Sequence, residues 1–121
     1  MYVEVYTNVN HYKVQELLDK FDVITVNSYL SCLTYHGATS RVGWNNIHLF
    51  WRGYLLSHPK LIFTSFGDPC KLYDFPYLKT YINAFSFSDE SQRAVANVIM
   101  GKIKAEGKNP ISFPPFFENE L

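Results

Sequence analysis

The sequence predicts an α/β fold: an open, mostly parallel sheet with helices on both faces, arranged as a three-layer sandwich like that of flavodoxin. Strand-like and helix-like hydrophobic patterns alternate along the chain, and alternation of this kind requires crossover connections between parallel strands. Two strand patterns, at 22–30 and 61–66, are almost continuously apolar, which is typical of strands covered on both faces. With 121 residues, of which 47% are hydrophobic, the chain is long enough for one domain with a core.

The first half of the chain predicts two strands and two helices. Residues 2–7 alternate like a strand with one polar face, and Asn10 can cap the helix that follows. The strand at 22–30 leads into a long loop at 31–43, and a second helix, 44–58, ends at a His-Pro pair. Both helices carry apolar residues at helical spacing: Val14, Leu17, Leu18 and Phe21, then Trp44, Ile47, Trp51, Tyr54 and Leu55.

The second half predicts a buried strand at 61–66, an irregular or briefly helical link at 70–79, and a strand at 80–87. Pro76 excludes a long regular helix in the link. Ser88 is a good cap for the last helix, whose first two residues are acidic and therefore favourable to the helix dipole.

The inner face of this last helix is predicted to comprise Val95, Val98, Ile99 and Ile103. Gly107 is expected to stop the chain, and 109–113 to add a last edge strand with Pro110 at its start. These boundaries define one α/β domain over 1–113 and a tail, 114–121, without a recognisable pattern.

Charge and hydropathy exclude several classes of protein. Eleven Lys and Arg balance eleven Asp and Glu, so the chain lacks the basic footprint of a protein that binds nucleic acid or an anionic membrane. It has no apolar run of about 18 residues and no signal-peptide pattern, which favours a cytoplasmic location. Cys32 and Cys70 share no metal or redox spacing, and we expect buried thiols rather than a disulfide.

The candidate site is the place where the strand LIFTSF ends, at Gly67, Asp68 and Pro69, because ligands of open α/β sheets bind beyond the carboxyl ends of the strands. One glycine followed by an aspartate cannot cradle a phosphate, so no nucleotide cofactor is expected. The histidines lack zinc spacing, and no metal is expected. His36, in the loop after a strand, and Asn27, on that strand, complete the set of candidate residues.

Carboxylates argue against catalysis by this chain alone. No Asp or Glu lies between Asp22 and Asp68, although glycoside hydrolysis needs two carboxyl groups about 5 to 10 Å apart. An aspartate before a proline is more often an Asx-turn residue than a catalyst. Trp44 and Trp51 lie on one helical stripe, which favours packing over sugar stacking.

The second half of the chain resembles the C-terminal domain of glycoside hydrolase family 3. The pattern is an apolar strand ending in a turn with proline, a short link, a strand, a helix ending in a Met-Gly pair, then a glycine turn and a strand. The corresponding segments are LIFTSFGDP, INAFSFSDESQRAVANVIMGKI and EGKNPISF, and the resemblance spans residues 15–113. The strand DVITVNSYL fits the family's strand before the long loop.

The resemblance implies that the chain is a fragment of such a domain and has a catalytic (β/α)₈ barrel as its partner. In the β-glucosidase-like branch the second domain supplies a glutamate from the loop that here is SCLTYHGATSRVGWNN, which has no carboxylate. The β-N-acetylhexosaminidase-like branch, whose barrel supplies the acid/base, fits that absence. The implied role is to pack on the barrel and to shape the rim of the sugar site through Asn27, His36, Gly67, Asp68 and Pro69.

Two alternatives remain open on sequence grounds. One is a stand-alone α/β binding or protein-interaction module that uses the strand-exit loops around Asn27, His36 and Asp68. The other, a nucleotide-binding regulatory domain, lacks the phosphate-cradling glycines. A domain without its barrel would expose an apolar interface, so self-association is also expected.

Overall fold

The computed structural model describes residues 11–30, 56–110, 112 and 114–115 of the chain. In chain order its elements are α1 (His11–Lys20), β1 (Ile24–Leu30), β2 (Leu61–Gly67), α3 (Lys71–Asp74), β3 (Tyr81–Asn83) and α4 (Asp89–Ile99). No helix within those ranges is long and apolar enough to cross a membrane. The predicted strand at 2–7, the loop at 31–43 and most of the helix at 44–58 lie outside the described residues.

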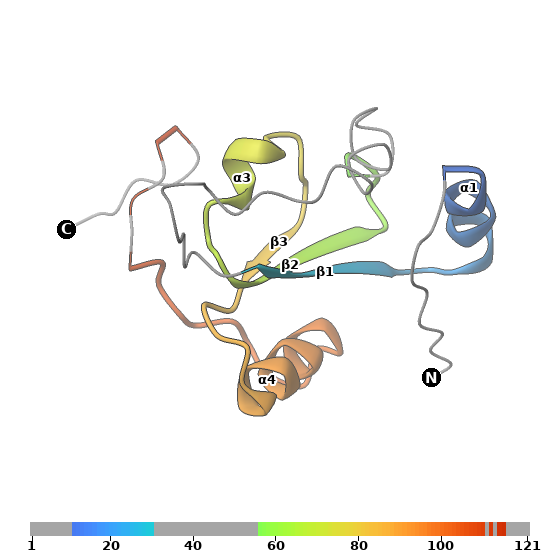
Figure 1. Cartoon of the computed structure of the whole chain (residues 1–121). Helices are drawn as coiled ribbons and strands as arrows, with labels where there is room; N and C mark the ends of the chain where they lie inside the picture. Colours follow the sequence, from blue (N-terminus) through green and yellow to red (C-terminus); the bar gives the residue numbers. More distant parts are fainter. Residues whose placement is uncertain (1–10, 31–55, 111, 113, 116–121) are drawn as a thin grey trace.

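The three strands form one parallel sheet in the order β1-β2-β3 (Figure 1). Val26, Phe63 and Tyr81 lie side by side in one row across this sheet. Because successive side chains of a strand point to opposite faces, the next row, which begins at Asn27, belongs to the other face. The prediction of an open parallel α/β sheet is therefore confirmed.

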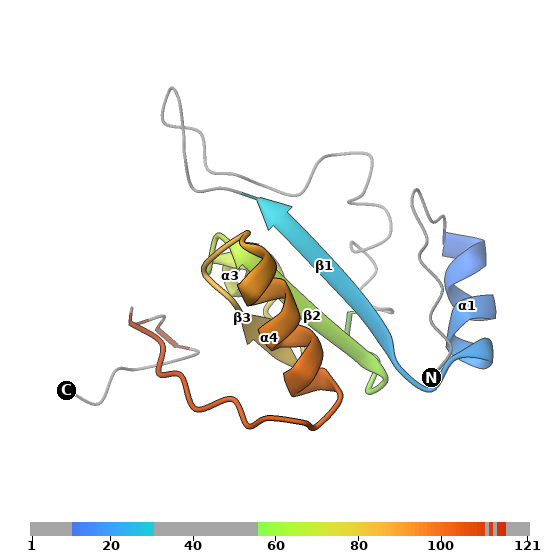
Figure 2. The same ribbon diagram turned by 90° about the horizontal axis from the view of Figure 1, so that it is seen from below.

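Helices cover both faces of the sheet. Helix α3 lies on one side and α4 on the other (Figure 1). Seen from below, α4 lies over the sheet with its amino end near the carboxyl ends of the strands (Figure 2). The core on the α3 side is a cluster of buried apolar side chains from α1, β2 and the segments that flank β2: Leu18, Leu56, Leu61, Phe63 and Phe75.

The two long strands differ in how far they are covered. The central strand β2 is buried on both faces, as its continuous apolar run predicts. For β1 the same prediction is wrong, because Thr25, Asn27 and Tyr29 are exposed. These three residues alternate along one face, so β1 has one covered and one open face.

Strand β3 is shorter than predicted, since it ends at Asn83 rather than at residue 87. The chain leaves the sheet through Phe85, a non-glycine residue with a φ of 55°. This left-handed backbone conformation is incompatible with continued strand pairing. Sequence patterning did not reveal the turn, because Phe85 is a residue typical of strands.

Helix α4 begins as predicted and ends earlier than predicted. The Ser88 hydroxyl accepts a hydrogen bond from the backbone N–H of Ser91 at 3.2 Å, which caps the first turn. The helix ends at Ile99, and Gly101 adopts a φ of 69°, the left-handed conformation that commonly terminates helices. Gly107 is therefore not the stop.

Two further predictions for this region are wrong. Ile103 lies beyond the helix and is 47% exposed, so it is not part of the inner face, whereas Val95 is buried as expected. The edge strand expected at 109–113 does not form at its described positions, since Asn109, Pro110 and Ser112 have no strand conformation.

Candidate functional site

The candidate site begins at the last residue of β2. Gly67 has a φ of 97°, a conformation that side chains other than hydrogen disfavour, and it turns the chain out of the sheet. Asp68 follows and is only 6% exposed, and Pro69 is also buried. The strand exit is thus folded back onto the protein, toward α3.

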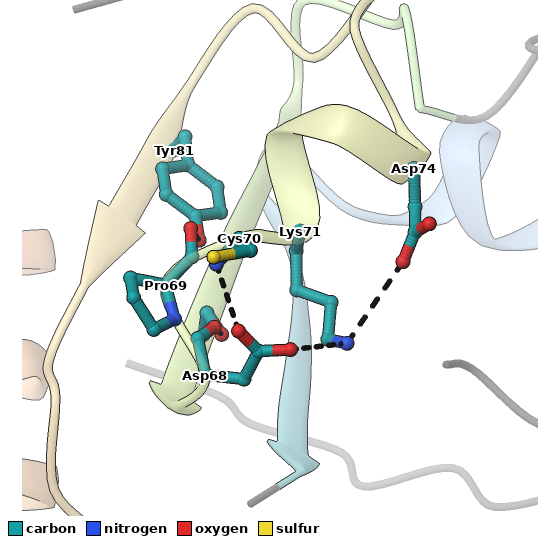
Figure 3. Close-up of polar contacts among 7 residues, drawn as sticks. Asp68, Pro69, Cys70, Lys71, Asp74 and Tyr81 are labelled. Carbon is teal, nitrogen blue, oxygen red and sulfur yellow. Dashed lines mark hydrogen bonds and ion pairs between the residues drawn. The ribbon is translucent and has the colours of Figure 1, made fainter. Parts of the chain in front are cut away.

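The Asp68 carboxylate is held by two neighbours (Figure 3). Its Oδ1 accepts a hydrogen bond from the backbone N–H of Cys70 at 2.9 Å, which is the Asx-turn geometry that the sequence predicts. Its Oδ2 lies 2.8 Å from the Lys71 Nζ. Lys71 is 1% exposed, so this is a buried ion pair, and the carboxylate of Asp74 lies 3.9 Å from the same ammonium group.

The backbone of the turn is fixed by two hydroxyl groups. The Ser65 hydroxyl donates to the Asp68 carbonyl, and the Tyr81 hydroxyl donates to the Pro69 carbonyl at 2.8 Å. Burial raises the pKa of Tyr81 to about 12, and the negative charge of Asp68 acts in the same direction, while Ser65 partly offsets both. Tyr81 therefore remains a neutral donor at physiological pH. The residues joined by these contacts are called the strand-exit network below: Ser65, Asp68, Pro69, Lys71 and Tyr81.

Cys70 is a free and exposed thiol beside this network, so the expectation that it is buried is wrong. Partial burial of the sulfur raises the pKa of Cys70, and the carboxylate of Asp68 raises it further. Reactive cysteines need the opposite shift, because the thiolate is the nucleophile. Cys70 is consequently a poor nucleophile at neutral pH.

The network offers no group suited to general acid/base catalysis. A catalytic carboxylate must reach the substrate, and that of Asp68 is buried and occupied by Cys70 and Lys71. Metal binding has no support either, because the described part of the chain contains no cluster of three His, Cys, Asp or Glu. In chemical terms the strand exit is a structural turn.

The other face of the same edge carries an aromatic stack. The ring of Tyr29 lies parallel to that of the buried Phe66, with centroids 4.7 Å apart, and the Phe87 ring follows at 6.5 Å from Tyr29. Gln92 of α4 links Phe87 to Tyr29 through two hydrogen bonds. Its Nε2 donates to the Phe87 carbonyl at 3.0 Å, and its Oε1 accepts from the Tyr29 hydroxyl at 3.4 Å.

Three aromatic side chains at this edge are open to solvent. Tyr29 is 50% exposed, Phe87 43% and Phe85 39%. They are called the aromatic edge patch below. Phe85 also holds its strained backbone conformation, which costs about 1 to 2 kcal/mol for a residue with a side chain. Backbone strain of this kind occurs most often at functional sites.

The sequence-predicted residues are only partly brought together. Gly67, Asp68 and Pro69 form one turn on the α3 side. Asn27 is exposed on the opposite face, with Tyr29, and does not join them. His36 lies outside the described residues.

Sequence reasoning missed Lys71, Tyr81 and the aromatic edge patch. Lys71 could have been found, because it stands three residues from Asp68 on one side and from Asp74 on the other. The aromatic edge patch could not, because it joins residues from β1 and from the segment after β3, which only the sheet order places together.

The comparisons with known proteins add no family to this description. No family model, no curated protein and no solved structure matches the chain. The fold and the site therefore define an α/β protein with a structural strand exit and an aromatic edge, and its function has to be argued from those features.

Proposed function

We propose that the chain is the accessory C-terminal domain of a family 3 glycoside hydrolase, of the β-N-acetylhexosaminidase kind. In this role it packs on a catalytic (β/α)₈ barrel that lies outside these 121 residues, and it does not hydrolyse sugars alone. The order of LIFTSFGDP and INAFSFSDESQRAVANVIMGKI along the chain supports the family, whereas the third segment of the resemblance, EGKNPISF, forms no strand at its described positions. The burial of Asp68 and the exposure of the aromatic edge patch support the roles assigned to these two surfaces below.

The single observation that carries the non-catalytic role is the burial of Asp68. Among the turns that directly follow a strand within the described residues, the one after β2 contains an acid, Asp68. Its Oδ1 accepts a hydrogen bond from the Cys70 N–H, and its Oδ2 pairs with the Lys71 ammonium group. A glycosidase acid/base would need an accessible carboxyl group facing a second one. At the strand exit the Asp68 carboxyl group is not accessible, and the nearby Asp74 carboxylate shares the Lys71 ammonium group with it.

The aromatic edge patch is the surface that we assign to the barrel. Exposed Tyr and Phe side chains are enriched at the centres of protein interfaces, where they bury much apolar area. The patch consists of aromatic side chains, and Gln92 holds the Tyr29 hydroxyl and the Phe87 backbone carbonyl before any partner arrives. A rigid apolar surface loses little side-chain entropy on docking.

The hydrolase assay tests the non-catalytic role. The purified chain is incubated with an aryl N-acetyl-β-glucosaminide, and release of the aryl alcohol is followed beside that of an Asp68→Ala variant. We expect no release above the buffer rate from either protein. Turnover that copurifies with the chain and disappears in the variant would show that Asp68 is catalytic and would refute the proposal.

The alternative of a stand-alone interaction module has the same support from the aromatic edge patch. It differs in the identity of the partner, since a module of that kind needs no barrel. The two are separated by measuring binding to a family 3 barrel, as described at the end of the Discussion.

A further inference from the structure

Helix α4 has a second exposed surface, on the side turned away from the sheet. In both ribbon views no other described helix or strand lies beyond it (Figures 1 and 2). The outward residues recur at helical spacing, and they are exposed except for the half-buried Asn97: Glu90, Arg93, Ala94, Asn97 and Met100. Two residues in the middle of this stripe, Ala94 and Asn97, have small or short side chains, which allow another helix to approach, whereas Arg93 beside them has a long one.

The two ends of α4 carry opposite charges. Asp89 and Glu90 are exposed in the first turn, and Lys102 and Lys104 are exposed just beyond the last turn. None of these four residues takes part in an ion pair among the described residues. The charges are thus available to a partner.

The basic end also exposes apolar side chains. Met100 is 39% exposed and Ile103 47%, close to the two lysines in sequence. An apolar pair beside unpaired charges is a typical composition for the core and rim of a small interface.

We infer that the outer face of α4 pairs antiparallel with α4 of a second copy of this chain. A surface that meets its own copy about a two-fold axis must be complementary to itself. Antiparallel helices meet this requirement, because the acidic end of each then faces the basic end of the other. A pairing centred between Ala94 and Asn97 places Asp89 opposite Lys102 of the second copy.

The helix length sets the scale of this contact. Eleven residues span about 16 Å, so the two charged clusters are separated by about that distance on each copy. A contact of one short helix with another buries less than the roughly 800 Å² per partner of a stable interface. The dimer is therefore weak, dependent on protein concentration, and weakened by salt.

Arg93 is the one basic side chain within the stripe itself. It lies one turn after Glu90 on the same helix, where an acid at i and a base at i+3 attract each other. No ion pair joins Glu90 and Arg93 among the described residues, so this attraction only partly offsets the repulsion between the Arg93 side chains of the two copies. The net charge of zero over the whole chain also leaves no overall repulsion between copies.

Charge reversal provides a direct test. One variant carries Asp89→Lys and Glu90→Lys, so both ends of its α4 are basic. A second carries Lys102→Glu and Lys104→Glu, so both ends are acidic. Sedimentation equilibrium measures the dissociation constant of each variant, of the wild type, and of an equimolar mixture of the two variants.

We expect the wild type to dimerise reversibly, and each variant alone to have a dissociation constant at least about tenfold higher, a change of 1.4 kcal/mol. The mixture should associate again, because a basic α4 then faces an acidic one. High salt should weaken both the wild-type dimer and the mixture.

A control variant with Asp19→Lys and Asp22→Lys has the same change in net charge as the Asp89/Glu90 variant, at exposed positions near the end of α1 and away from α4. It should dimerise like the wild type. Circular dichroism checks that all variants are folded, since the acid-to-base change also opposes the helix dipole.

The inference is overturned if the wild type stays monomeric, if either α4 variant dimerises as well as the control, or if the mixture fails to associate. None of these results bears on binding of the barrel, which the aromatic edge patch governs. The two proposals therefore fail or succeed independently.

Discussion

At the scale of single residues, the contact of Lys71 with Asp68 determines the role of the strand exit. The sequence places Asp68 where an open α/β sheet presents its catalytic groups, and only the buried ammonium group beside it removes that role. A buried charge without a partner is expensive, and in this pair each charge lies beside one of the opposite sign. The aspartate is consequently a structural residue.

Replacing Lys71 with methionine tests this interpretation. The variant keeps most of the side-chain volume and leaves the Asp68 carboxylate buried without its cation, so we expect a loss of about 3 to 5 kcal/mol in the free energy of unfolding. Urea denaturation followed by fluorescence measures the change. Lys79→Met, at an exposed position, is the control and should change stability by less than about 0.5 kcal/mol. Equal stabilities of the two variants would mean that the pair contributes nothing.

Tyr81 gives the strand-exit network a pH dependence. Its pKa of about 12 in the folded protein exceeds the ordinary value of 10.0, so folding favours the neutral hydroxyl. The stabilisation is complete below about pH 10 and is lost as the pH rises toward 12. Unfolding measured between these pH values should show stability falling more steeply for the wild type than for Tyr81→Phe.

The same variant has a second expected effect at neutral pH. Without the hydroxyl group, the Pro69 carbonyl loses its donor, which should cost about 1 kcal/mol. Identical slopes against pH for the wild type and Tyr81→Phe would contradict the assignment of the raised pKa.

At the scale of elements, the end of α4 shows where local sequence signals mislead. The apolar spacing continues past the helix to Ile103, and a glycine stands on each side of that residue, at Gly101 and Gly107. Either glycine could end a helix, and the pattern favoured the later one. In the structure the helix ends just before Gly101, because, of these two glycines, only Gly101 adopts the left-handed conformation.

Alanine at the two glycines should separate these roles. A Cβ at either position has nothing within 4 Å to clash with, so only the backbone conformation differs. Gly101→Ala should lose about 1 kcal/mol of stability, because a left-handed backbone is costly for alanine. Gly107→Ala should be neutral or stabilising by up to about 1 kcal/mol through the unfolded state. Thermal unfolding of both variants measures this, and equal shifts would contradict a helix that ends at Gly101.

The elements that the sequence predicts well are those fixed by local patterning. A run of β-branched and aromatic residues predicts β2, and a serine followed by two acidic residues predicts the start of α4. The alternation of strand and helix patterns along the chain predicts the parallel sheet. The end of β3 could not be predicted, since the turn at Phe85 is imposed on a strand-forming residue. The open face of β1 depends on coverage by distant parts of the chain, which patterning does not encode.

At the scale of the whole molecule, the two sides of the carboxyl edge differ in their chemistry. The α3 side is closed by the strand-exit network, and the α4 side displays the aromatic edge patch. The sequence located this edge through Gly67 and Asp68, but the patch depends on the path of the chain after β3, which brings Phe87 beside Tyr29 of β1. A closed polar side and an open apolar side together fit a domain that docks rather than one that catalyses.

Binding to a barrel tests this account most directly. The (β/α)₈ barrel of a family 3 β-N-acetylhexosaminidase from the same organism is produced without its second domain, and its affinity for the chain is measured by calorimetry. Three versions of the chain are compared: the wild type, a Tyr29→Asp and Phe87→Asp double variant, and a Tyr73→Asp and Tyr77→Asp double variant. The last pair places charges on two tyrosines that are exposed outside the patch.

We predict that the wild type and the Tyr73/Tyr77 variant bind the barrel equally, and that the Tyr29/Phe87 variant loses at least about tenfold in affinity, or 1.4 kcal/mol. Circular dichroism of the free variants confirms that each is folded before the comparison is made. A wild-type chain that does not bind, an organism that encodes no such barrel, or a Tyr29/Phe87 variant that binds as well as the wild type would contradict the account.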